Sequence, residues 1–357
     1  MADDQAIAVH EQSGPWVDSD QFESELAARS SGLTDEQQDV ARSLHEHGFA
    51  LLRGAVPPEL CDQVRAEVDL LFDGEYARRE RRVPNAWDEG APAVRSVATS
   101  PGIQACLEAV YGRRPIPFQT LNFKWGSQQD YHADSIHFTS IPDRYMCGVW
   151  VALEPVHDQN GPLSYYPGSH RVPQYRSVSP GAGPERYAGF ESMQRDVMDR
   201  LGVSPVDLVA EQGDALIWTS HLLHGGRPIR REGSTRWSQV THYFFEGCTY
   251  FQPIYSDHLT GALRLLDIVD LNTLEPVPHR YGDLAVVTET LPDGRRRVAL
   301  VDEEGREVAG DIARYRQLEV DLATVRADRD SLRASASFRL GNALIAPARW
   351  LRRRLSS

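Results

Sequence analysis

The sequence predicts a mainly β protein, a β-sandwich or jelly roll preceded by helices. From about residue 112 to 255 the chain consists of short apolar or alternating runs such as PFQTLNFKW, CGVWVALEPV and RWSQVTHYFF. Gly, Pro, Asn and Asp separate these runs, which is typical of short strands joined by tight turns. The chain has 357 residues and is 41% hydrophobic. It can therefore bury one large core or two modest ones.

The N-terminal part is expected to begin with an arm and to continue as helix, strand and helix. Residues 1–34 are polar and acidic with little periodicity, so we expect a loose arm or one poorly packed helix. Thr34 is the expected N-cap of the next helix, GFALLRG is the expected strand, and a second helix opens after Pro57 and Pro58. The main domain is expected over residues 35–265.

Two appendages are expected after the main domain. Residues 266–312 read as a linker and a β-hairpin whose turn is set by Pro292, Asp293 and Gly294. Residues 313–357 read as an amphipathic helix with a basic end, and its apolar residues follow a short coiled-coil seam at Leu318, Leu322, Val325 and Leu332. Such a seam would form a homo-oligomer. The basic end would contact an anionic membrane or a protein partner, unless the helix simply has a solvated basic face.

Charge and cysteine usage exclude several classes of protein. The formal net charge of −13 predicts a surface that repels nucleic acid, so no nucleic-acid partner is expected. The chain has no CxxC motif, which excludes a zinc ribbon and indicates reduced thiols. No leader peptide and no long apolar run are present, so a cytoplasmic location is expected, with peripheral membrane association through the C-terminal tail. The four cysteines are Cys61, Cys106, Cys147 and Cys248.

The segment YHADSIHF, residues 131–138, raises the question of a metal site. On a strand, His132 and Asp134 would share one face, while His137 would have the opposite parity unless the chain bends. An imidazole and a carboxylate on one face suit Fe(II), Mn(II) or Zn(II). A third ligand would be His221 or His224 of SHLLHGGRP, which completes the facial triad of non-haem iron sites. The alternative is a strand with two buried, hydrogen-bonded histidines.

A second feature lies twelve residues after His224. Arg236 and Ser238 would share a strand face and present a guanidinium fork and a hydroxyl group. Guanidinium groups bind carboxylates through paired hydrogen bonds, so this pair suits a dicarboxylate ligand. A metal triad together with a carboxylate clamp is a much rarer combination than an HxD pair alone.

With these motifs in place, the chain resembles the phytanoyl-CoA dioxygenase family over roughly residues 36–260. The resemblance includes the entry LHEHGFALLRGAVPPELCDQVRAEV, the HxD of YHADSIHF, NGPLSYYPGSH, and LLHGGRP followed by TRWSQVTHYFF. It implies a double-stranded β-helix core, cupin-like, with flanking α-helices, and a requirement for Fe(II), 2-oxoglutarate and O2. The HGG context and the shorter distance to Arg236 favour His224 over His221 as the distal ligand.

The resemblance assigns roles residue by residue. The implied iron ligands are His132, Asp134 and His224. The implied co-substrate contacts are Arg236, Ser238, Trp150 and Asn122. Because halogenating relatives replace the carboxylate with a small residue, the presence of Asp134 implies hydroxylation of a C–H bond, with release of succinate and CO2, or another oxidation without halide.

Other readings and roles stay open at this stage. The tail is similar to C-terminal segments of bacterial glycosyltransferases and polysaccharide assembly proteins, which suggests a saccharide among small-molecule substrates. The alternatives are an inactive cupin-like scaffold in such assembly and a metal-independent jelly-roll isomerase or epimerase. The basic run RRERR, which ends at Arg82, is a solvated helix face or an anionic-substrate site. No role follows for His137, Tyr165, Tyr166 and His221.

Overall fold

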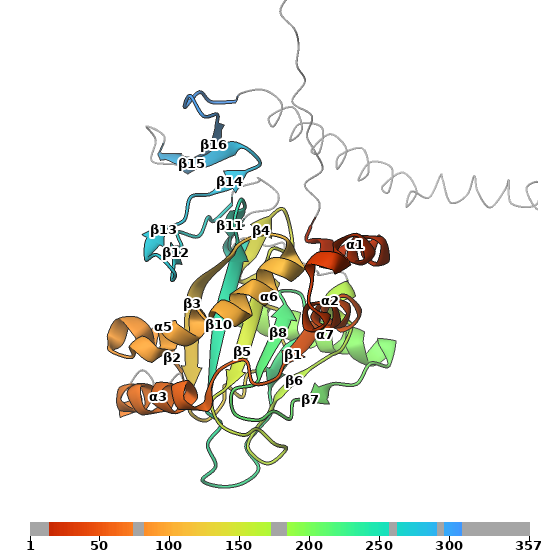
Figure 1. Cartoon of the computed structure of the whole chain (residues 1–357), viewed down its shortest axis with the longest axis vertical. Coiled ribbons are helices and arrows are strands. Elements are labelled where there is room, and N and C mark those ends of the chain that lie inside the picture. The colour runs from red at the N-terminus through yellow and green to blue at the C-terminus, as the bar shows by residue number, and fades with distance from the viewer. Residues whose placement is uncertain (1–13, 74–81, 173–183, 257–262, 291–295, 309–357) are drawn as a thin grey trace, which may run out of the picture. The chain divides into compact units, whose positions relative to one another are not determined.

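The computed structural model describes residues 14–73, 82–172, 184–256, 263–290 and 296–308. The chain divides into two compact units, residues 1–298 and residues 299–357. The first unit contains the β core and the helices around it (Figure 1). The expected coiled-coil seam and basic tail of residues 313–357 lie outside the described residues, so oligomer formation and membrane or partner contact remain predictions.

One face of the core is a six-stranded antiparallel sheet. Its strand order is β1-β8-β5-β10-β3-β2. Every residue of β8, β5 and β10 is buried, because helices cover one face of this sheet and a second layer covers the other. In sheet order the strands are β1 (Phe49–Leu52), β8 (Ala215–Thr219), β5 (Met146–Ala152), β10 (Ser238–Phe245), β3 (Pro115–Phe123) and β2 (Val83–Pro84).

The second layer is formed by shorter strands. One three-stranded antiparallel sheet has the order β7 (Val206–Asp207), β6 (Leu163–Tyr165) and β9 (His224–Gly226). A two-stranded pair joins β11 (Thr249–Phe251) to β4 (Thr139–Ile141). Leu163 and Tyr165 of β6 pack in one apolar cluster with Trp150 and Trp218 of the large sheet. The mainly antiparallel β architecture with flanking helices is confirmed.

Helices cover the other face of the large sheet, where α5 and α6 pack on β3 (Figure 1). Thr34 caps α2 as predicted, in a capping box with Gln37, and α2 ends at Gly48 in the left-handed conformation. The α-helices are α1 (Phe22–Arg29), α2 (Asp35–His47), α3 (Pro58–Asp69), α5 (Pro92–Ala98), α6 (Pro101–Tyr111) and α7 (Pro184–Leu201). The short 3-10 helices are η1 (Trp16–Asp18), η2 (Ser30–Gly32), η3 (Leu70–Asp73), η4 (Ala86–Glu89), η5 (Asp134–Ile136), η6 (Ser169–Arg171) and η7 (Pro253–Tyr255).

The expectation of a loose N-terminal arm is wrong for residues 14–34. Trp16 and Val17 of η1 and Phe22 and Leu26 of α1 are buried members of the main apolar core. The Phe22 ring stacks on His45 of α2 at a centroid separation of 4.0 Å. The four apolar residues are too few to give a strong sequence pattern, but one turn of helix places Phe22 and Leu26 on one face.

The segment that follows residue 265 is also more than a linker. The strands β12 (Val269–Asp270) and β13 (Glu275–Pro276) pair with each other. Asp270 is buried and accepts a hydrogen bond of 2.7 Å from Arg114, and the amide of Leu271 donates to the carbonyl of Pro117. These contacts fix residues 269–276 against the end of β3, so the expected boundary at residue 265 is too early.

The remaining strands are β14 (Arg280–Tyr281), β15 (Leu284–Thr290) and β16 (Arg296–Val301). The expected hairpin turn at residues 292–294 lies outside the described residues. Within the described part of the chain, no helix combines the length and apolar character needed to cross a lipid bilayer.

Candidate metal centre

The two histidines and the carboxylate of the predicted triad come together between the two β layers. The backbone of His132 forms an isolated antiparallel bridge with His224, with N–H to carbonyl hydrogen bonds of 3.0 Å in both directions. The ligand atoms of His132, Asp134 and His224 all lie within 4.8 Å of one another, and all three residues are buried. The Nε2 atoms of both histidines lie 3.8 Å from Oδ1 of Asp134. One metal ion could contact all three ligand atoms after small side-chain adjustments.

The local backbone differs from the strand that the sequence predicted. Ala133 is extended, but Asp134 begins the 3-10 helix η5, so HxD is a bridge followed by a tight turn. This turn brings Asp134 back toward His132. It also directs His137 into the same cavity, against the parity expected for a strand. The predicted convergence of His132 and Asp134 is therefore reached by a different geometry.

Hydrogen bonds to the protein set the orientation of each ligand. Nδ1 of His132 lies 2.9 Å from the carbonyl of Asp130, and Nδ1 of His224 lies 3.1 Å from the carbonyl of Leu222. Since a carbonyl only accepts, each Nδ1 carries the proton and each Nε2 presents its lone pair to the centre. The indole N–H of Trp218 donates to Oδ2 of Asp134 at 2.7 Å, which leaves Oδ1 for a metal.

The electrostatics keep the ligands in their metal-binding forms. Burial and the neighbouring His224 lower the pKa of His132 to about 4. Burial alone would raise the pKa of Asp134, but the surrounding histidines and the Trp218 hydrogen bond outweigh it and lower the pKa to about 2. At neutral pH His132 is therefore uncharged and Asp134 is ionised, as metal coordination requires.

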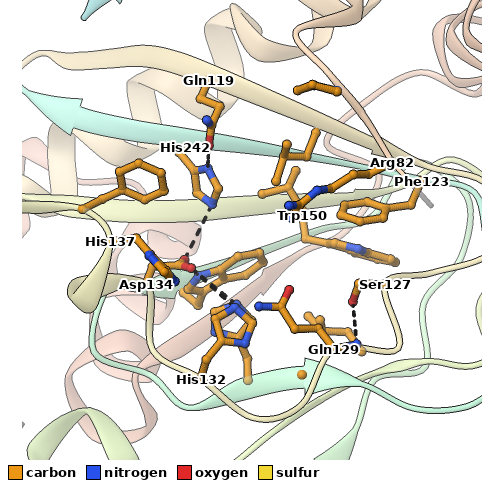
Figure 2. Close-up of a pocket in the computed structure, with 18 of the residues that line it drawn as sticks. Arg82, Gln119, Phe123, Ser127, Gln129, His132, Asp134, His137, Trp150 and His242 are labelled. Atoms are coloured by element: carbon orange, nitrogen blue, oxygen red, sulfur yellow. Dashed lines mark hydrogen bonds and ion pairs between the residues drawn. The ribbon is translucent and has the colours of Figure 1, made fainter. Parts of the chain in front are cut away.

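His242 and Trp218 are neighbours of the triad that the sequence reasoning missed. Nε2 of His242 lies 3.7 Å from Oδ2 of Asp134, and its Nδ1 is hydrogen-bonded to Oε1 of Gln119 at 2.9 Å (Figure 2). The alternation along β10 offered a signal for His242, since Val240 and His242 both line the cavity. The Trp218 contact depends on how β8 and η5 pack, which no local pattern reveals.

Arg236 is a buried cation that lines the same cavity as the metal ligands. Its side chain donates to Oγ of Ser238 at 2.9 Å, while its Nε atom is buried without a hydrogen-bond partner. Its guanidinium carbon lies 5.5 Å from the ring centre of Trp150. Burial lowers the pKa of Arg236 to about 10, so the group stays protonated at neutral pH. Among the described residues no carboxylate forms a salt bridge with Arg236, and Glu154, which acts on it at longer range, lies 3.8 Å from Arg65.

A glycine makes room for this arginine. Gly126 has φ +69°, and a Cβ atom placed there would lie 2.5 Å from Nη2 and 2.8 Å from Nε of Arg236. The backbone that directly precedes Gly126 is tied to the Arg236 segment, because Trp125 and Arg236 form a parallel bridge and the Arg236 amide donates to the carbonyl of Lys124. Because Gly126 has no side chain, the backbone at this position can lie directly against the guanidinium of Arg236.

The other co-substrate expectations have mixed outcomes. Trp150 lines the cavity, and its indole N–H is buried without a partner. Ser238 is fully buried and accepts from Arg236, so it supports the guanidinium from outside the cavity lining. The expectation for Asn122 is wrong: Leu121 and Phe123 line the cavity, whereas Asn122 faces the other side of β3 and contacts Gln239.

Three of the residues left open have structural contacts. His221 lies 3.0 Å from Oγ of Ser220 and is outside both the metal group and the cavity lining. Tyr165 packs on Phe49 with a centroid separation of 4.2 Å. Tyr166 packs edge-on against Tyr131. Both tyrosines are buried and neither lines the cavity, so these are packing contacts.

A single cavity of about 530 Å³ joins the metal ligands to Arg236. Figure 2 shows its side chains converging on the space between Asp134, Gln129, Trp150 and Phe123. Its walls come from both β layers: residues of β3, β5, β8 and β10 on one side, and residues of β6 and β9 on the other. This volume suits a small-molecule ligand, and polar side chains from both β layers line it.

Residues 44–236 match the family model described as Phytanoyl-CoA dioxygenase (PhyH), which is more than half of the chain and includes every ligand of the candidate centre. The protein belongs to the phytanoyl-CoA dioxygenase family. It is 26% identical over 253 residues to the peroxisomal phytanoyl-CoA dioxygenase of Rattus norvegicus, which covers 63% of this chain and 73% of that protein. The Homo sapiens enzyme of the same name is 23% identical over 245 residues, covering 61% of this chain and 70% of that protein.

A solved structure shares the fold of this family member. The structure of the non-haem α-ketoglutarate-dependent carbocyclase SnoK from nogalamycin biosynthesis superposes with a TM-score of 0.51 at 18% identity. The superposition covers 67% of this chain and 95% of that protein. The predicted family membership is confirmed by the family model, and the core shares its fold with the carbocyclase structure.

Proposed function

We propose that this family member is an Fe(II)- and 2-oxoglutarate-dependent oxygenase that hydroxylates a C–H bond of a small molecule or saccharide, with release of succinate and CO2. The observation that carries the proposal is Arg236, a buried guanidinium that shares one cavity with the metal triad and has no carboxylate partner in the described chain. A buried unpaired charge costs several kcal/mol, which a dicarboxylate ligand would offset.

The residues fit the two groups that the family implies. His132, Asp134 and His224 supply two imidazole nitrogens and one carboxylate oxygen, the donor set of facial-triad Fe(II) sites. Arg236 would hold the distal carboxylate of 2-oxoglutarate, and the unpartnered indole N–H of Trp150 is a further donor in the same cavity. When bound, Fe(II) would let O2 oxidise an unactivated C–H bond, with 2-oxoglutarate supplying the other two electrons as it is converted to succinate and CO2.

The chain itself contributes orientation and exclusion of water. Trp218 and the backbone carbonyls of Asp130 and Leu222 hold the ligand atoms toward one point. The apolar side chains of Leu121, Phe123 and Leu163 close the cavity wall, so that a C–H bond is held in a largely dry site. Choice of the carbon to be oxidised would follow from how the substrate is seated against these walls.

An anaerobic titration tests the proposal. The full chain is titrated with Fe(II) and then with 2-oxoglutarate, and the weak charge-transfer band of the keto-acid chelate is followed near ~500 nm. We expect a band that is lost in His224→Ala and kept in the matched control His221→Ala. Iron binding without a band would favour the alternative function of a jelly-roll isomerase or epimerase. No iron binding would favour the alternative of an inactive cupin-like scaffold.

A further inference from the structure

A second arginine lines the cavity and has no place in the proposed metal and co-substrate contacts. Arg82 directly precedes β2, whose Val83 pairs with Asn122 of β3, so the edge of the large sheet fixes its backbone. Its side chain is half-buried. Figure 2 shows Arg82 on the side of the cavity where Phe123 lies, opposite Gln129. It is therefore a cavity residue, and the interpretation of RRERR as a fully solvated helix face does not hold for its last member.

Arg82 lies in the same cavity as the metal ligands. It shares the cavity lining with His132, Asp134 and His224. Within the described ranges, no carboxylate forms a salt bridge with Arg82. The guanidinium of Arg82 thus lies in the cavity of the metal ligands, and no carboxylate of the described residues neutralises it.

In a site that holds Fe(II) and 2-oxoglutarate, the positive charge of Arg82 is not balanced by any negative charge. Among the aspartate, glutamate, arginine and lysine side chains, those that line the cavity are Arg82, Arg236 and Asp134. The two charges of Fe(II) and the charge of Arg236 are balanced by Asp134 and the two carboxylates of 2-oxoglutarate. Arg82 then remains as one uncompensated positive charge facing the space that a substrate would occupy.

We infer that Arg82 binds an oxyanion of the substrate, a carboxylate or a phosphate group, so that the substrate is an organic acid or a phosphate ester. The inference rests on the proposed function, because the balance assumes Fe(II) and 2-oxoglutarate in the cavity. A guanidinium offers paired N–H donors that match either oxyanion, and partial burial strengthens the contact. The amide of Gln129, which also lines the cavity, would contact neutral parts of the same ligand.

The test uses two small probes, acetate for a carboxylate and methyl phosphate for a phosphate ester. The full chain is loaded with Zn(II) and one equivalent of 2-oxoglutarate, which prevents turnover, and binding of each probe is measured from the broadening of its NMR signals. The variants are Arg82→Gln, Arg82→Lys and the matched control Arg230→Gln, an exposed arginine outside the cavity lining. The Fe(II) chelate band is recorded for each variant.

We expect the wild type and Arg230→Gln to bind at least one probe, and Arg82→Gln to bind it about tenfold more weakly, with partial recovery in Arg82→Lys. Preference for acetate or methyl phosphate identifies the oxyanion. Equal binding in the wild type and Arg82→Gln, or no probe binding at all, would overturn the inference while an intact chelate band keeps the proposed function. A tenfold weaker 2-oxoglutarate affinity in Arg82→Gln would make Arg82 a co-substrate contact and also overturn it. Absence of the band in the wild type would reject both.

Discussion

Each ligand residue of the candidate centre has two polar side-chain atoms, and one of them is already hydrogen-bonded to the protein. His132 and His224 donate from Nδ1 to backbone carbonyls, and Asp134 accepts from Trp218 through Oδ2. The atoms left over, two Nε2 and one Oδ1, face one another. This arrangement sets ligand orientation before any metal arrives, which reduces the entropy lost on binding.

Replacing Trp218 by Phe tests this orientation. The change removes the N–H donor to Asp134, so the carboxylate becomes free to rotate and its pKa rises. We expect iron affinity, measured without 2-oxoglutarate, to fall by about 10–100-fold. Trp150→Phe is the matched control, because its indole N–H has no protein partner, and it should leave iron affinity unchanged. Equal losses in both variants would point to general disruption of the cavity.

Gly126→Ala tests the position of Arg236. The new Cβ atom would meet the guanidinium at 2.5 Å, and the guanidinium can only move away from its present position. We expect the KM for 2-oxoglutarate to rise about tenfold or more, with iron affinity unchanged. Gly233→Ala is the control, because Gly233 also has a positive φ, +76°, but nothing lies within 4 Å of its Cβ position. If both variants behave alike, backbone strain and not the guanidinium is responsible.

At the scale of elements, the sequence identified three residues that do converge in the structure, by an argument that was only partly right. His132, Asp134 and His224 were predicted, but the strand parity used for HxD fails because Asp134 opens a 3-10 turn. Asn122 was misplaced by one residue of register, since Leu121 and Phe123 occupy the cavity face. Trp218 and His242 could not be found as partners of Asp134, because packing between distant elements decides their contact.

The N-terminal elements η1 and α1 are expected to stabilise the fold, although the polar composition of this segment did not predict it. Phe22→Ala removes a buried ring stacked on His45 and should lower the free energy of unfolding by about 3 kcal/mol or more, measured by urea denaturation. Glu23→Ala in the same helix is exposed and should change it by less than about 0.5 kcal/mol. Similar small effects for both would mean that α1 adds little to the core.

His170 of η6 makes the packing of α2 sensitive to acid. Its Nε2 donates to the carbonyl of His45, its Nδ1 is buried without a partner, and burial lowers its pKa to about 4. As pH falls from the usual histidine value of 6.5 towards 4, the unfolded chain takes up a proton that the folded chain does not. The free energy of unfolding should therefore fall over this range, and the contribution of this group then levels off.

The measurement is urea denaturation of the metal-free protein at about pH 7 and about pH 5. His170→Gln keeps a donor for the His45 carbonyl but cannot titrate, so its loss of stability between the two pH values should be smaller than that of the wild type. The pKa values of His132, His137, His242 and His279 are also lowered by burial, and these groups account for the pH dependence of stability that remains in the variant. If His170→Gln loses as much stability between the two pH values as the wild type does, the acid sensitivity comes from those other groups alone.

At the scale of the whole molecule, metal binding should stabilise the fold. A ligand present at 100 times its Kd adds about 2.7 kcal/mol to the free energy of unfolding when it binds only the folded state. We expect Fe(II) or Zn(II) to raise the thermal midpoint of the full chain and of His221→Ala. The same metals should leave His224→Ala nearly unchanged. A rise in all three proteins would place the bound metal elsewhere.

The backbone bridge between His132 and His224 has a kinetic consequence. The two residues are 92 positions apart in the sequence, so the bridge closes a long loop. Contacts between distant segments form late in folding, because the entropy of closing the intervening loop is lost first. During refolding, metal affinity should therefore emerge only after most secondary structure has formed. The competence to bind iron would then be a marker of completed folding.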